Sequence, residues 1–347
     1  MGILKVTVIV TVLDDPRLER ALESLRAQRR PPDVVLIADG GSSPVIAAIC
    51  DRFRASDPRF VHLHAPGTIT ESRNQAIRAI STELIAFLDT DEVAPPDWLG
   101  ALLAPLLADR EVGFSGGPTP ALDGTARNRA ARYYNAYLRR FYDEVVRDRP
   151  WAIPMGNSAW RKQLFDELGP LVAALPTNGA EDQEFENRAI AKGWKAAYVP
   201  EAWVAHDYTE LDLGALLRRQ YRYASGAYVV WRTHGRTYEA SKFDLIYLAL
   251  PGALVVAAVL LLLPWRGLLF LPGIVLLAVT ALGFVALEAN LAVQGARDEP
   301  RYPGYRYRPL IEPWRKWATM LGALSGLLDR NKSSPDRSRS SAAPPTE

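Results

Sequence analysis

Three carboxylates follow directly on an apolar run in the first third of the chain. Leu84–Leu88 leads straight into Asp89, Thr90, Asp91 and Glu92. One interpretation is a strand that leaves the core into a solvated acidic turn. The other is that the carboxylates hold a divalent cation, because hard oxygen ligands suit Mg²⁺ or Mn²⁺ and such a cation can bridge to a diphosphate. The surrounding elements have to decide between the two.

Strands and helices alternate before this acidic run. Strands are predicted at 5–13, 33–39, 59–64 and 84–88, and helices after Asp15-Pro16 and at about 44–54 and 71–80. This alternation predicts an α/β fold with a mostly parallel sheet that is covered on both faces. In such sheets ligands bind at the carboxyl ends of the strands. Asp14, Asp39 and Asp89 all lie at such ends, which favours the cation over the solvated turn.

The usual glycine-rich phosphate motifs are absent from the sequence. Neither G-x-G-x-x-G nor G-x-x-x-x-G-K-[ST] occurs, so neither a dinucleotide fingerprint nor a P-loop is supported. A phosphate-bearing ligand would need another source of positive charge, which a cation on Asp89 and Asp91 would supply.

Five segments in order carry a family resemblance. "VTVIVTVLDD", "LIADGGSS", "ESRNQAIRAISTELIAFLDTDE", "GNSAWRKQLFDELG" and "GAEDQEFENRAIAKGWKAAYVPEAWVAH" together resemble glycosyltransferase family 2 over roughly residues 3 to 230. The resemblance implies an inverting enzyme of the glycosyltransferase-A fold, a Rossmann-like domain that binds a nucleotide-diphosphate sugar with Mg²⁺ or Mn²⁺.

The resemblance also implies which residues hold the donor. They are Thr11, Leu13, Asp39, Arg73, Asn74, Asp89 and Thr90 for the nucleotide sugar, and Asp91, Asp89 and His206 for the metal. Asp91 would be the direct ligand, with Asp89 nearer the ribose. Asp39 could instead form only an Asx turn, and His206 could instead cap a strand. Glu92 would either support the metal ligands or be solvated.

Glu181 and Asp182 match the catalytic acidic pair of the family. The resemblance makes Asp182 the general base that takes the proton of the acceptor, with Glu181 positioning the acceptor or the sugar. The alternative is two carboxylates that stabilise the dipole at a helix start, since Phe185, Ala189 and Ile190 follow at helical spacing. Asn157 is predicted on the sugar or acceptor side.

The amino-acid composition argues against some classes of binding partner and site. Lys and Arg number 41 against 39 Asp and Glu, a formal charge of +2, which argues against a general nucleic-acid binder. The single cysteine, Cys50, excludes an internal disulfide framework and a cysteine-only zinc site.

Two charge-free stretches follow the acidic pair. Leu245–Leu263 and Gly267–Leu287 are each long enough to span a bilayer as a helix, and "PWRG" between them predicts a hairpin. The alternative is a pair of buried core helices. Arginines and lysines on both flanks predict a multi-pass protein of the cell membrane with its catalytic domain in the cytoplasm.

The predicted organisation has five parts. They are a catalytic domain at 1–232, a juxtamembrane linker at 233–244, two transmembrane helices at 245–289, an amphipathic membrane-surface segment at 290–330 and a disordered tail at 331–347. The amphipathic segment follows from apolar residues at helical spacing beside Arg315 and Lys316.

The sequence between the acidic pair and the first apolar stretch bears on the acceptor. The nearest sequence to the Q-x-x-R-W of processive synthases is "RRQYRYASG", which does not fit its spacing, so transfer of a single sugar is predicted. Arg218, Arg219 and Arg222 could bind an acidic lipid headgroup, or could be ordinary membrane anchors. We expect transfer to a lipid-linked or cell-envelope glycan acceptor. The alternatives are transfer to polyprenyl phosphate and a catalytically silent membrane scaffold.

Overall fold

A computed structural model describes residues 4–41, 43–147, 153–173, 179–234, 246–262 and 266–328. The predicted disordered tail and most of the predicted linker at 233–244 therefore lie outside the described residues.

A seven-stranded sheet forms the centre of the catalytic part, with the strand order β3-β2-β1-β4-β7-β6-β8. The strands are β1 (Val6–Val12), β2 (Val34–Asp39), β3 (Phe60–His64), β4 (Leu84–Asp89), β6 (Val112–Gly116), β7 (Asn157–Arg161) and β8 (Lys195–Tyr198). The β1, β2, β3 and β4 strands are parallel, whereas β7 runs antiparallel between β4 and β6. The predicted mostly parallel sheet is thus confirmed.

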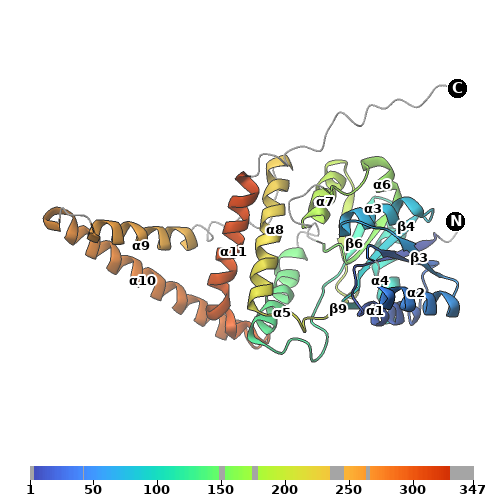
Figure 1. Cartoon of the computed structure of the whole chain (residues 1–347), viewed down its shortest axis with the longest axis horizontal. Coiled ribbons are helices and arrows are strands. Elements are labelled where there is room, and N and C mark those ends of the chain that lie inside the picture. The colour runs from blue at the N-terminus through green and yellow to red at the C-terminus, as the bar shows by residue number, and fades with distance from the viewer. Residues whose placement is uncertain are drawn as a thin grey trace, which may run out of the picture.

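Alternation along each strand divides the core between the two faces of the sheet. In β4, Leu84, Ala86 and Leu88 pack on one face, and Ile85 and Phe87 on the other. The first face is covered by α1 (Leu18–Arg26), α2 (Pro44–Ser56) and α4 (Trp98–Ala108). The second face is covered by α3 (Ile69–Ala79), α6 (Lys162–Leu168) and α7 (Glu181–Ala191), as Figure 1 shows.

Two long helices pack against each other on one side of the catalytic part, next to the arm of the molecule described below. α8 (Leu213–His234) packs against α11 (Arg308–Leu328) (Figure 1). Glycines at positions 322 and 326 allow the two helices to approach closely. A Cβ on Gly322 would lie 2.2 Å from the Tyr221 carbonyl oxygen, and a Cβ on Gly326 would lie 2.3 Å from the Ser225 carbonyl oxygen. α5 (Arg129–Phe141), a wide helical turn (Tyr142–Val146) and a 3₁₀ turn (Tyr305–Tyr307) pack beside this helix pair.

The apolar C-terminal stretch forms an arm. α9 (Ile246–Leu262) and α10 (Arg266–Asp298) pack side by side and project from the rest of the molecule (Figure 1). Within the described residues, only α10, over Phe270–Asp298, is long and apolar enough to cross a membrane; α9 is shorter. α10 also continues to Asp298, past the predicted end at Leu287. Only one of the two predicted spans therefore has the length that a membrane crossing needs, and the crossing itself stays a prediction.

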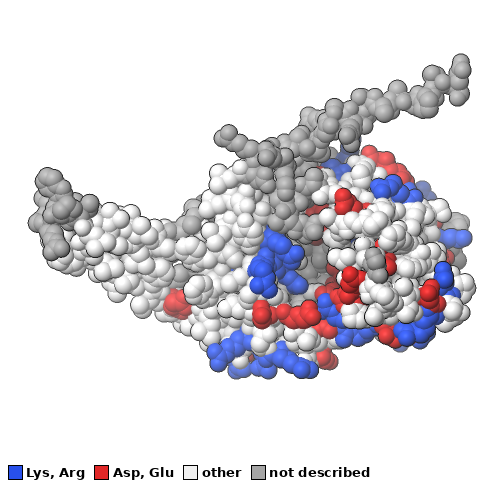
Figure 2. Space-filling model, viewed as in Figure 1, with Lys and Arg blue, Asp and Glu red and all other residues white. Residues whose placement is uncertain are grey.

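The surface of the arm is apolar. Figure 2 shows it white over most of its area, while charged side chains gather over the remainder of the molecule. Only 11 % of the apolar window of α10 is buried. The alternative of buried core helices therefore does not describe this arm.

α11 has one inward and one outward face. Ile311, Arg315, Thr319 and Ala323 are buried toward the protein. Its exposed apolar residues recur at helical spacing on the outward face: Leu310, Trp314, Leu321, Leu324 and Leu328. The predicted amphipathic helix is therefore present, and its placement at a membrane surface stays a prediction.

Candidate active site

A single buried arginine joins the two acidic motifs, which lie more than ninety residues apart in the sequence. The Nη2 of Arg73 donates to Asp89 Oδ1 at 2.7 Å, and its Nη1 donates to Glu181 Oε1 at 2.9 Å. Arg73 is only 4 % exposed and lies on α3, whose first turn is fixed by a capping box between Thr68 and Glu71. The end of β4 and the start of α7 are therefore held at one place.

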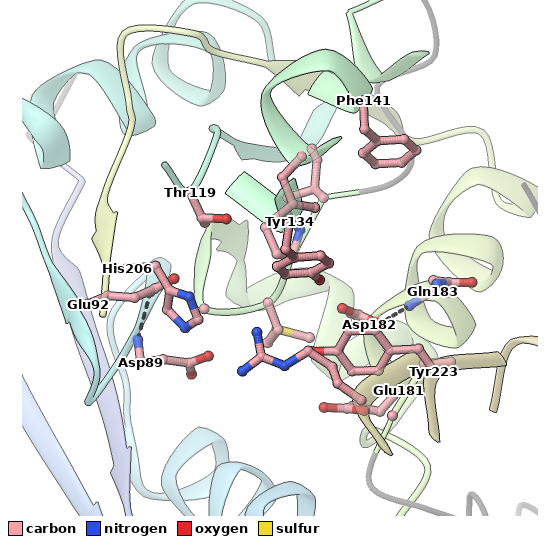
Figure 3. Close-up of a pocket in the computed structure, with 18 of the residues that line it drawn as sticks. Asp89, Glu92, Thr119, Tyr134, Phe141, Glu181, Asp182, Gln183, His206 and Tyr223 are labelled. Atoms are coloured by element: carbon pink, nitrogen blue, oxygen red, sulfur yellow. Dashed lines mark hydrogen bonds between the residues drawn. The ribbon is translucent and has the colours of Figure 1, made fainter. Parts of the chain in front are cut away.

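A cavity of about 260 Å³ opens at this place. Asp89, Glu92 and His206 lie on one side of it, and Glu181 and Asp182 on the other (Figure 3). Aromatic side chains form much of the remaining wall: Tyr134, Tyr137, Phe141, Tyr142, Tyr208 and Tyr223. Carboxylates facing aromatic rings suit a ligand with both charged and sugar-like parts.

The acidic pair occupies the first turn of α7. Ala180, immediately before it, has a φ of 73°, a left-handed conformation that is strained for a residue with a side chain. Glu181 is buried in its ion pair with Arg73, whereas Asp182 is partly exposed to the cavity. Burial and the neighbouring Glu181 charge raise the pKa of Asp182 to about 7. A carboxylate with this pKa can accept a proton near neutral pH.

The turn before the acidic pair is supported by α8. A Cβ on Gly226 would lie 2.1 Å from the carbonyl oxygen of Gly179. Only glycine at position 226 lets the helix approach the backbone of this turn so closely.

Asp91 and His206 are brought together by a two-stranded ribbon. β5 (Glu92–Val93) pairs antiparallel with β9 (Ala205–His206), and His206 Nε2 lies 3.0 Å from Asp91 Oδ2. Burial raises the pKa of Asp91, but His206, Arg17 and Arg219 outweigh it and lower the pKa to about 2.

These two side chains fit a divalent cation. Donor atoms about 2.1 Å from one ion, at right angles to each other, stand about 3 Å apart, which is the separation found here. Asp89, the third predicted ligand, is instead ion-paired with Arg73. Among the residues that the structure describes, no group of three possible ligands converges, so a cation here would need oxygens from the substrate or water as well.

Glu92 is not a solvated residue. It is 3 % exposed, and its Oε2 accepts a hydrogen bond from the Asp89 backbone N–H at 3.1 Å. Burial and the charges of Asp89 and Asp91 raise its pKa well above the usual value. Gly156 packs over this carboxyl cluster, since a Cβ there would lie 2.4 Å from Asp89 Oδ2.

The predicted nucleoside residues lie at or next to the carboxyl ends of β1 and β2. The hydroxyl of Thr11 is buried without a hydrogen-bond partner among the described residues, and Leu13 is 67 % exposed. Asp39 accepts from the Gly41 backbone N–H and pairs with His62, so it does form an Asx turn. Thr90 lies in the turn between β4 and β5.

Two residues that were predicted to contact substrate are hydrogen-bonded within the protein. Asn157 is fully buried, accepts from Trp98 Nε1, and donates to the carbonyls of Pro118 and Ala202. The side-chain amide of Asn74 is likewise used in both directions by the backbone of Leu171. Both amides have their polar atoms satisfied inside the protein, so we assign them to holding loops rather than to contacting substrate.

Of the three arginines in the first half of α8, Arg219 is the one that lines the cavity. Its guanidinium lies 5.9 Å from the centre of the Tyr134 ring and lines the cavity, whereas Arg218 and Arg222 are exposed on other sides of α8 and do not line it. Among the described residues, no carboxylate lies within ion-pair distance of Arg219. The sequence could place three arginines on one helix but not the rotation of that helix, so it did not distinguish Arg219 from Arg218 and Arg222.

Comparison with known proteins agrees with this arrangement. Residues 7–169 match the model of glycosyl transferase family 2. The succinoglycan biosynthesis protein ExoM of Rhizobium meliloti is 29 % identical over 233 residues, 64 % of this chain and 71 % of that protein. A pre-mycofactocin glycosyltransferase of Mycobacterium tuberculosis is 28 % identical over 223 residues, 58 % of this chain and 43 % of that protein.

A solved structure shares the fold. The mannosyltransferase PcManGT of Pyrobaculum calidifontis, in complex with GDP-Man and Mn²⁺, aligns with 94 % of this chain and 88 % of its own, with a TM-score of 0.58 and 20 % identity. This likeness confirms a glycosyltransferase-A fold for the described part of the chain.

Proposed function

We propose that the chain is a membrane-bound inverting enzyme that moves one sugar from a nucleotide-diphosphate sugar to a lipid-linked or cell-envelope glycan acceptor. Its domain at residues 7–169 belongs to glycosyltransferase family 2. The observation that carries the proposal is the bridge of Arg73 between Asp89 and Glu181. It holds the donor-binding end of β4 and the acidic pair of α7 at one cavity.

Asp182 is the proposed general base. In an inverting transfer, an acceptor hydroxyl attacks the anomeric carbon from the face opposite the diphosphate, and one group must take its proton. Asp182 faces the cavity, and its pKa of about 7 keeps it basic enough to do so. The proton then resides on the Asp182 carboxyl, while the bond from the anomeric carbon to the diphosphate breaks.

Glu181 and Arg73 have positioning roles in this proposal. The Glu181 carboxylate is fixed by Arg73 and adds negative charge beside Asp182, which contributes to the raised pKa. Arg73 also orients Asp89 toward the donor. These contacts fix the acidic pair and Asp89 relative to each other before either substrate binds.

Asp91 and His206 would hold Mg²⁺ or Mn²⁺, which would act as a Lewis acid for the departing diphosphate. Support comes from the 3.0 Å between their donor atoms and from the Mn²⁺ in the mannosyltransferase complex. Arg219 would add a positive charge to the same side of the cavity.

The acceptor class rests on the relatives and on the cavity wall. One relative is named for succinoglycan biosynthesis, which supports a glycan acceptor. The aromatic residues of α5 suit the apolar faces of sugar rings. Polyprenyl phosphate is the second candidate, favoured by the positive charge that Arg219 presents to the cavity.

The apolar arm is the proposed membrane anchor. α10 would cross the bilayer, with α9 beside it, and the outward face of α11 would lie on the membrane surface. In Figure 1, α11 runs across the base of the arm, as a helix on the surface would. Arg297 in the last turn of α10, and Arg301 and Arg306 after it, would put this side in the cytoplasm by the positive-inside rule.

The proposal can be tested with detergent-purified protein and a panel of nucleotide sugars. Release of nucleoside diphosphate is followed with Mn²⁺ or Mg²⁺, with and without a membrane lipid extract. Release from one donor that depends on the extract is expected. Nucleotide binding without release from any donor would favour the catalytically silent scaffold.

A further inference from the structure

A buried polar cluster on α11 lies outside the catalytic residues already described. Glu312 and Arg315 are 4 % and 3 % exposed and form an ion pair in which Arg315 Nε and Nη2 donate to the two oxygens of Glu312 at 3.0 and 2.9 Å. Tyr133 of α5 also donates to this carboxylate. The pair thus lies between α11 and α5.

The same arginine reaches two residues of the cavity wall. Its Nη1 donates to Gln220 Oε1 of α8 at 2.9 Å, and its guanidinium carbon lies 4.1 Å from the centre of the Tyr137 ring of α5. Both Gln220 and Tyr137 line the cavity, although Arg315 itself does not.

Packing alone does not require these charges. A buried ion pair can often be replaced by apolar residues without loss of stability, because desolvation of the two ions offsets their attraction. A guanidinium, however, fixes the direction of its partners through its planar set of donors. Here one donor holds Gln220 of α8, and the guanidinium itself contacts the ring of Tyr137 of α5.

We propose that Arg315 is a positioning residue that orients Gln220 and Tyr137 as the acceptor-binding wall of the cavity. The inference rests on the proposed transfer to a membrane acceptor and extends it, because α11 also carries the outward apolar face. One helix thereby links the surface proposed to contact lipid with the wall that holds the acceptor.

The test uses the full chain with Arg315→Met and Glu312→Gln combined. The double substitution avoids an unpaired buried charge and keeps an acceptor for the Tyr133 hydroxyl. We expect kcat/KM for the lipid extract to fall roughly tenfold to a hundredfold through KM, as a small misplacement can produce. The affinity for Mn²⁺ with GDP or UDP should stay within about twofold, because the donor side is untouched.

Lys316→Met is the matched control, since it removes the neighbouring cation of the same helix and should leave both constants unchanged. Gln220→Leu should reproduce the loss, and adding it to the double variant should cause little further change, because the two act through one contact. A folded double variant with unchanged KM for the extract, or with donor affinity reduced equally, would overturn the positioning role.

Hydrogen exchange supplies a readout that needs no acceptor. In the double variant we expect faster exchange in segments 129–141 and 213–234, and exchange unchanged from wild type would contradict the inference. Because this measurement does not involve transfer, it separates failure of the positioning role from failure of the proposed function, which would appear as no lipid-dependent release by wild type.

Discussion

The carboxyl group of Asp182 combines a raised pKa with access to the cavity. Because the base must be ionised to accept a proton, we predict that kcat/KM rises with pH up to a pKa of about 7 and then levels off. A pH–rate profile with the donor and lipid extract measures this. An inflection near the ordinary aspartate value, or a flat profile across neutral pH, would exclude Asp182 as the titrating base.

Asp91 carries the second prediction at residue scale. Asp91→Ala removes the carboxylate that pairs with His206, so Mn²⁺-dependent nucleotide binding should weaken by about tenfold or more, while metal-free binding changes little. Calorimetric titration with nucleotide, with and without Mn²⁺, gives both values. Arg17→Ala is a suitable control, since it removes a charge that acts on Asp91 but leaves both proposed metal ligands in place. Equal weakening in both conditions would contradict the metal role.

At the scale of elements, α8 supports the turn that carries the acidic pair. Gly226→Ala would place a Cβ 2.1 Å from the Gly179 carbonyl oxygen, so the helix or the turn must move. We predict a loss of about 1–3 kcal/mol in unfolding free energy and a fall in kcat larger than the change in nucleotide affinity. Chemical denaturation and steady-state rates check the two parts.

Gly252→Ala is the control for this substitution, because a Cβ at position 252 of α9 meets no atom within 4 Å. It should leave both stability and kcat close to wild type. If Gly226→Ala behaved in the same way, close support of the turn by α8 would be wrong.

The positions of helices and strands were predictable where the hydrophobic pattern in the sequence is long. The strands and helices up to β4 follow from β-branched runs, proline at the first turn of α2 and the apolar spacing of α1, and their bounds agree with the structure within a few residues. The antiparallel β7 between β4 and β6 was not predicted, because strand order depends on contacts between distant segments.

The candidate site was predictable only in part. Asp89, Asp182 and His206 were assigned from the motifs, and the structure places all three at the cavity. The β5 and β9 pair that brings His206 to Asp91 has two residues in each strand, too few for any sequence pattern. Asn74 and Asn157 were assigned to substrate because a sequence does not show that a side chain is fully hydrogen-bonded inside the protein.

On the scale of the whole molecule, the arm of α9 and α10 leaves most of its apolar surface uncovered by the rest of the protein. Val279 of α10 is 60 % exposed, and Val279→Lys would put a charge in the proposed span at a cost of about 2.5–3.5 kcal/mol. We predict that this variant loses membrane association on fractionation and keeps nucleotide binding.

Val45→Lys is the matched control, because Val45 is an exposed residue of α2 on the catalytic part. This variant should fractionate with membranes as wild type does. If Val279→Lys remained membrane-bound to the same extent, α10 would not be the anchor.

The most direct test of the central claim compares wild type with Asp182→Asn in a single turnover. Labelled donor is mixed with excess enzyme, Mn²⁺ and lipid extract, and transfer of the sugar to lipid is measured beside nucleotide binding. We predict that Asp182→Asn binds nucleotide as wild type does but transfers at least about 100-fold more slowly, as expected for loss of a general base. Transfer at the wild-type rate would contradict the assignment of this cavity as the site of sugar transfer.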